Sequence, residues 1–278
     1  MLLNCAGKPL DLSRPAVMGV LNLTPDSFSG DGLAGSIDAA CERALALEAA
    51  GAAVIDIGGE STRPGAARVA VDQELARVLP VIERLAPRLA IPISIDTRHA
   101  EVMRAAVGAG AGLINDIAAL REPGALAAAA ALGVPVILMH MQGEPGTMQQ
   151  APHYDDVVAE VAAFLGERVV ACDAAGIPRE RILIDPGFGF GKTTSHNLAL
   201  LRGLSVLCRQ GLPVVAGLSR KSLIGAITDA RVTQRLGGSI ALAVLAAQHG
   251  ARLLRVHDVD ATVQALAMLD AAQGDANG

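Results

Sequence analysis

The sequence is poor in aromatic residues and in positive charge, and each shortage excludes a class of protein. Aromatic residues make up 2% of the 278 residues and tryptophan is absent, so the core must consist mainly of alanine, valine, leucine and isoleucine. The net charge is −5, without a long basic run, which argues against nucleic acid or a membrane as the main partner. An anionic ligand must therefore be bound by a few local Arg, Lys and His residues.

Cysteines are also few. Cys5, Cys41, Cys172 and Cys208 lie far apart and include no C-x-x-C pair. We therefore expect neither a zinc site nor a disulfide framework, but reduced thiols in the cytoplasm. The first residues contain no apolar leader-like stretch, and the longest apolar stretches are broken by charge. No membrane-spanning segment is predicted.

What the chain does have is a regular alternation of two kinds of segment. Hydrophobic residues make up 51%, and short runs rich in β-branched residues alternate with longer Ala/Leu-rich segments. The predicted strands are Val17–Leu21, Val54–Ile57, Ile91–Ile95, Leu113–Ile117, Val134–Met139, Ile182–Ile184, Val214–Ala216 and Leu253–Val256. The predicted helices are Ser36–Ala50, Asp72–Ala86, Arg98–Ala109, Pro123–Leu132, Asp155–Ala175, His196–Gln210, Gln234–His249 and Val259–Ala272.

These strand–helix units repeat about every 33 residues along the whole chain, without a linker. Several strands are apolar on both faces, as in a buried parallel sheet. We therefore predict an α/β fold, a (β/α)₈ TIM barrel that forms a single domain over residues 1–278. A doubly wound open sheet is the alternative, but evenly sized units favour closure.

Polar residues follow the strands. They are Asn22, Asp56, Asp96, Asn115, His140, Asp185, Ser219–Lys221, Arg255 and His257. One such residue alone is best explained as a cap of the next helix, but every strand ends in this way. Because the carboxyl ends of barrel strands lie on one face, these side chains are predicted to converge on one pocket.

The residue types indicate the ligand. Asp96, Asn115 and Asp185 suit a heterocycle that carries N–H donors. Arg63, Arg255, His257 and Asn22 suit a diphosphate with a hard cation on oxygen ligands. The pocket is therefore predicted to bind an amino-heterocycle with a phosphorylated leaving group.

Two local patterns are misleading. Residues 186–193, PGFGFGKT, resemble a phosphate-binding loop, but Pro186 occupies the position of its first glycine. We expect these glycines to let the backbone approach a flat ligand. Lys221 could form a Schiff base as in barrel aldolases, but Asp96 and Asp185 would keep it charged. For His140 a buried structural role and a functional role are equally supported.

At these residues the chain resembles the bacterial dihydropteroate synthase family. The matching stretches are Met18–Ser29, Asp56–Ala66, Ser94–Thr97, Ile114–Ile117, Leu138–Gly143, Asp185–Lys192, Gly217–Ser222 and Arg255–Val259. They cover nearly the whole chain in order. The resemblance implies a Mg²⁺-dependent transferase that condenses a pterin diphosphate with p-aminobenzoate and releases pyrophosphate, in folate synthesis. It also suggests a homodimer formed through helices late in the barrel.

The resemblance implies a role for individual residues. The pterin ring would be bound by Asp96, Asn115, Met139, Asp185, Phe188, Gly217 and Lys221. The diphosphate would be bound by Asn22, Thr62, Arg63, Arg255 and His257, with Mg²⁺ on Asn22. The p-aminobenzoate would be bound by Phe28, Thr62, Arg63, Pro64, Phe190, Ser219 and Lys221. Catalysis is assigned to Asp96, Asp185, Lys221 and Arg255.

Two rival hypotheses remain. A pterin-binding methyltransferase barrel would share the Asp/Asn floor, but it carries no diphosphate, which leaves Arg255 and His257 without a purpose. An inactive barrel that serves as a partner protein would be expected to lose some strand-end residues, and none is missing.

Overall fold

The computed structural model describes residues 1–24, 37–61 and 68–274, and parallel strands form its centre. In chain order these are β3 (Ala16–Asn22), β4 (Val54–Gly58), β5 (Ile93–Asp96), β6 (Leu113–Asp116), β7 (Val136–Met139), β8 (Ile182–Asp185), β9 (Val215–Ala216) and β10 (Leu253–Val256). The order in the 8-stranded sheet is β8-β7-β6-β5-β4-β3-β10-β9. A parallel bridge between Ile184 and Val214 connects β8 to the segment that leads into β9. The sheet therefore closes, and the predicted (β/α)₈ barrel is confirmed.

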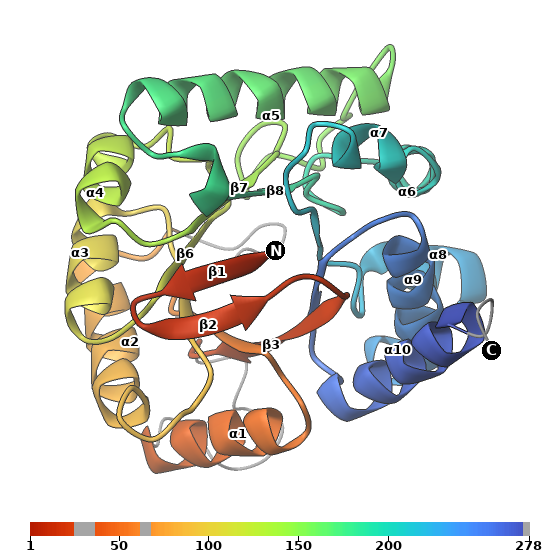
Figure 1. Cartoon of the computed structure of the whole chain (residues 1–278). Helices are drawn as coiled ribbons and strands as arrows, with labels where there is room; N and C mark the ends of the chain where they lie inside the picture. The colour runs from red at the N-terminus through yellow and green to blue at the C-terminus, as the bar shows by residue number, and fades with distance from the viewer. Residues whose placement is uncertain (25–36, 62–67, 275–278) are drawn as a thin grey trace.

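Helices surround the ring of strands (Figure 1). They are α1 (Ile37–Ala49), α2 (Val71–Leu85), α3 (Ala100–Gly108), α4 (Ala125–Leu132), α5 (Val157–Ala174), α6 (Thr194–Arg202), α7 (Leu204–Cys208), α8 (Ser222–Thr228), α9 (Leu236–Gln248) and α10 (Val259–Gly274). Two differ from prediction: α8 was not foreseen, and His196–Gln210 is divided at Gly203. A Cβ there would lie 2.8 Å from Val158, so α5 packs against the chain at this break. Within the described ranges, no helix has the length and apolarity needed to cross a membrane.

Successive strand residues point alternately out of the barrel and into it. The outward residues, such as Ile55, Ile95 and Leu138, belong to the large hydrophobic core beneath the helices. The inward residues at the amino ends of the strands form a separate apolar cluster: Met18, Val54, Leu113, Ile137, Leu183, Val215 and Leu253. The barrel therefore has two cores, one around the sheet and one inside it.

An antiparallel hairpin, which the sequence analysis missed, covers the amino end of the barrel. Its strands are β1 (Leu2–Cys5) and β2 (Lys8–Asp11), and they lie across the middle of the ring in Figure 1. Its side chains join the inner apolar cluster: Leu3, Cys5 and Leu10, with Leu12 just beyond. Since the hairpin closes this end, the opposite end is the one left for a site.

Candidate active site

A cavity of about 870 Å³ lies at the carboxyl ends of the barrel strands. Twelve of the predicted site residues line it: Asn22, Asp96, Asn115, Met139, Asp185, Phe188, Phe190, Gly217, Ser219, Lys221, Arg255 and His257. The other four, Phe28, Thr62, Arg63 and Pro64, lie outside the described residues. The structure thus brings together every predicted residue that it describes, although their individual roles stay predictions.

An ion network forms the floor of this cavity. The Arg255 side chain donates from Nε to Asp56 Oδ2 at 2.6 Å and from Nη2 to Asp96 Oδ2 at 2.7 Å. Asn115 Nδ2 also donates to Asp56 Oδ2, at 3.1 Å. Asp56 is fully buried, and the sequence analysis gave it no ligand. A signal was present, because Asp56 lies two residues beyond the inward-facing Val54 and therefore faces the interior too.

Burial shifts the pKa values of the acids in this floor. Removal from water raises the pKa of Asp96 from 3.8 to about 7, although the charge of Arg255 opposes the rise. Burial also raises the pKa of Asp185, which the Gly187 N–H opposes by donating to Oδ1 at 2.7 Å. Ionising either carboxyl group is therefore costly in the protein alone. A positively charged group bound beside them would favour their ionised forms and would itself be stabilised by them.

The basic groups of the cavity shift in the opposite direction. Burial and the nearby charge of Arg255 lower the pKa of Lys221 to about 8 and that of His257 to about 4. His257 is therefore neutral at pH 7. Its Nδ1 lies 3.0 Å from Ser219 Oγ, and its backbone N–H donates to the same oxygen at 3.2 Å. The sequence analysis assigned Ser219 to p-aminobenzoate and His257 to the diphosphate, and in the structure their side chains are direct neighbours.

The loop after β8 forms one wall of the cavity through Phe188 and Phe190. Lys221 Nζ lies 4.2 Å from the centre of the Phe190 ring, within the range of a cation–π interaction. At two glycines of this loop the backbone lies very close to other backbone of the protein. A Cβ at Gly187 would lie 1.9 Å from the His140 carbonyl oxygen, and one at Gly191 would lie 2.4 Å from that of Gln142. Packing against protein is thus sufficient to require glycine at these two positions, and the expected approach of a ligand to this backbone stays a prediction.

Of the two roles weighed for His140, the structure favours the structural one. The side chain is 6% exposed, its Nδ1 lies 2.9 Å from Lys192 Nζ, and its ring meets Phe164 edge to face at 4.9 Å. Burial and the charge of Lys192 lower its pKa to about 3, so it is neutral. It does not belong to the cavity lining.

The donors available for a hard cation are few. The described part of the chain contains no group of three or more His, Cys, Asp or Glu residues placed to hold a metal ion. Asn22 contributes an amide oxygen to the cavity at the end of β3. Mg²⁺ is usually bound through one or two carboxylates together with phosphate oxygens and water. Asn22 would therefore be a single protein ligand, and a diphosphate and water would have to supply the other oxygens.

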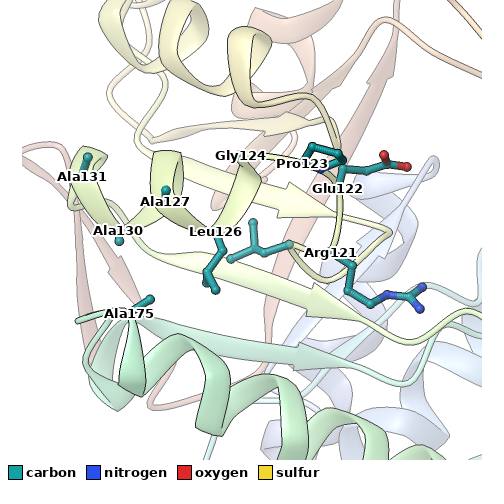
Figure 2. A pocket seen from close by; sticks show the side chains of 10 residues that line it. Arg121, Glu122, Pro123, Gly124, Leu126, Ala127, Ala130, Ala131 and Ala175 are labelled. Carbon is teal, nitrogen blue, oxygen red and sulfur yellow. The ribbon is translucent and has the colours of Figure 1, made fainter.

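A second cavity, of about 830 Å³, lies outside the barrel at α4. Figure 2 shows Ala127, Ala130 and Ala131 along α4, with Ala175 across from them and Arg121 on the loop before the helix. Its lining is mostly alanine and other apolar residues and contains none of the predicted site residues. The candidate active site is therefore the cavity inside the barrel.

The fold and this site define a pterin-binding barrel enzyme. Residues 18–257 match the model of the family described as Pterin binding enzyme. The chain is 53% identical to the dihydropteroate synthase of Escherichia coli K12 over 271 residues, 98% of this chain and 96% of that one. The chain therefore belongs to the dihydropteroate synthase family.

Solved structures agree with this assignment. A Xanthomonas albilineans dihydropteroate synthase with 4-aminobenzoic acid superposes with a TM-score of 0.93 at 58% identity, covering 98% of both chains. The same organism's enzyme in complex with 7,8-dihydropteroate gives a TM-score of 0.90 at 55% identity, covering 98% of this chain and 99% of that one.

Proposed function

We propose that the chain joins p-aminobenzoate to the methylene carbon of dihydropterin methyl diphosphate, which gives dihydropteroate and pyrophosphate for folate biosynthesis. The observation that carries the proposal is the floor of one cavity, where Asp96, Asn115 and Asp185 face Lys221 and Arg255. Acceptor groups on this floor match the N–H donors of a pterin ring. The Xanthomonas albilineans relative supports the choice of substrates, since it was solved with 4-aminobenzoic acid and with the product.

In the proposed reaction the amine nitrogen forms a bond to the methylene carbon while the carbon–oxygen bond to the diphosphate breaks. The electron pair leaves with pyrophosphate, and the amine proton is released to solvent. An aromatic amine is neutral at pH 7, so no strong base is required. Positive charge grows on the pterin as the leaving group departs, and Asp96 and Asp185 stabilise it. We propose a dissociative displacement on this ground.

The leaving diphosphate needs compensation of its charge. Arg255 would provide it, although two of its nitrogens already donate to Asp56 and Asp96. His257, with a pKa lowered to about 4 by burial, would contribute a hydrogen bond but no charge. Mg²⁺ bound to Asn22 and the diphosphate would supply the remaining positive charge.

Two further proposals concern the state of the protein. Ile227, Val232, Leu236 and Leu245 are large apolar side chains that are exposed on and between α8 and α9. This exposure supports a homodimer formed through these helices. The four cysteines are unpaired in the structure, which supports a location in the reducing cytoplasm.

The test is a coupled assay for pyrophosphate with both substrates and Mg²⁺, with dihydropteroate identified by mass spectrometry. We expect product only when both substrates are present, and its loss when EDTA removes the cation. A methyltransferase barrel would instead bind a methylated tetrahydrofolate and release no pyrophosphate. An inactive barrel would give no product with either donor.

A further inference from the structure

Lys192 lies behind the cavity wall that residues 187–190 form, and the proposed reaction gives it no role. Its side chain is 3% exposed. Nζ lies 2.9 Å from each of three acceptors, the carbonyl oxygens of Gly187 and Phe190 and the Nδ1 of His140. Burial lowers the pKa of Lys192 to about 7, while the charge of Asp185 opposes the fall. In the ammonium form the group has three N–H donors, and each of them has an acceptor. Because Lys192 does not line the cavity, it can act on substrate only through the groups that it holds and through its charge, which lowers the pKa of Asp185.

Those groups are the two ends of the cavity wall. Gly187, Phe188, Gly189 and Phe190 all line the cavity, and Lys192 holds the first and the last by their carbonyl groups. At the first end, the Gly187 N–H donates to the Asp185 carboxylate at 2.7 Å. At the other end, the Phe190 ring lies 4.2 Å from Lys221 Nζ.

We infer that Lys192 is a positioning residue for the pterin substrate, because its ammonium group fixes the wall 187–190 between Asp185 and Lys221. This inference rests on the proposed function and adds a determinant of substrate affinity outside the cavity. His140 is the anchor on β7's side: its backbone N–H donates to the Asp185 carbonyl oxygen at 2.9 Å, and its neutral ring accepts the third Lys192 bond. The wall is thereby tied to the end of β7 as well as to β8.

The test is Lys192→Met, which keeps the length of the side chain and removes its donors. The matched control is Lys8→Met. Lys8 Nζ donates to the carbonyl oxygens of Ala86 and Leu89 at 2.9 and 2.6 Å, but in the hairpin at the other end of the barrel. Titration calorimetry with hydroxymethylpterin would measure affinity, and thermal denaturation would measure stability. We expect Lys192→Met to bind this probe at least tenfold more weakly, and Lys8→Met to bind it as the wild type does.

Unchanged affinity of Lys192→Met for hydroxymethylpterin, whatever the melting temperature of the variant, would overturn the inference. The proposed function would still stand if the wild type synthesises dihydropteroate. A wild type without dihydropteroate synthesis would overturn both. If Lys192→Met does not fold, His140 gives a second test. His140→Gln offers an oxygen acceptor to Lys192, whereas His140→Leu offers none. We expect severalfold weaker binding only in His140→Leu, and equal affinity in the two variants would overturn the inference.

Discussion

The two ends of the barrel interior differ completely in chemistry although the same strands build both. On four strands the inward residue changes from apolar to polar within one step of the pleat: Val54 to Asp56, Leu113 to Asn115, Leu183 to Asp185 and Leu253 to Arg255. The apolar layer is closed by the hairpin and excludes water. The polar layer faces a cavity. On these four strands the apolar end serves stability and the polar end carries the chemistry. Substitutions at the apolar end should therefore change stability alone, whereas substitutions at the polar end should change activity.

The largest effect is expected at the polar end, from Arg255→Ala. The substitution leaves the buried carboxylates of Asp56 and Asp96 without their cation, which costs about 3 kcal/mol or more. It also removes the group proposed to hold the diphosphate, so activity should be lost. Urea denaturation and the coupled assay measure the two effects, and affinity for the pterin diphosphate should fall more than affinity for hydroxymethylpterin.

Leu113→Ala at the apolar end is the counterpart of Arg255→Ala. It should lower the free energy of unfolding by roughly 2–5 kcal/mol, because it opens a cavity beneath the hairpin. The folded enzyme should keep the KM of the wild type. The division between the two ends would be wrong if Leu113→Ala changed KM, or if Arg255→Ala kept the activity of the wild type.

An intermediate effect is expected from Asp185→Asn, in a comparison of two buried aspartates. The amide presents an N–H where the pterin needs an acceptor, which should weaken hydroxymethylpterin binding by about 1–3 kcal/mol, roughly five- to 150-fold. Asp116→Asn is the matched control, since Asp116 is also buried and accepts from Ala118 N at 2.7 Å. Asp116 does not line the cavity. Equal losses in calorimetry for the two variants would rule out a direct contact between Asp185 and the pterin.

The last comparison concerns pH. Asp96 has a pKa near 3.8 when unfolded and about 7 in the folded protein, because burial disfavours its charged form. Between these values the folded state binds more protons, so the free energy of unfolding should fall as pH rises from about 4 to 7. Asp96→Asn should show a shallower fall than the wild type. Leu113→Ala should keep the slope of the wild type, and denaturation at several pH values would show whether the slopes differ.

The sequence was sufficient to predict the barrel strands and the described residues that converge on the cavity, because polar residues follow every strand and the carboxyl ends of barrel strands lie on one face. It was not sufficient to predict the pairing of Arg255 with Asp56. β10 and β4 are not neighbours in the sheet; β3 lies between them, with Arg255 opposite Met18 and Asp56 opposite Val20. That ion pair depends on how the closed barrel brings side chains together across its interior.

Other features were missed for local reasons. The strands of the hairpin are four residues each, too short for a clear alternation. Lys192 was considered only as part of a phosphate-loop pattern, and a pattern of glycines does not show which carbonyl groups a lysine will reach. The predicted p-aminobenzoate residues Phe28 and Pro64 lie outside the described residues, so their placement stays a prediction.

The hairpin also bears on the order in which the chain folds during synthesis. Leu3 and Leu10 are translated before the barrel strands, but the cluster that they complete includes Leu253 from β10. These associations span nearly the full chain, and contacts so distant in sequence are slow to form. Most of the barrel must therefore be synthesised before the hairpin can pack against the amino end of its strands. Until then the apolar side chains of the hairpin lack Leu253, against whose cluster they pack in the folded barrel.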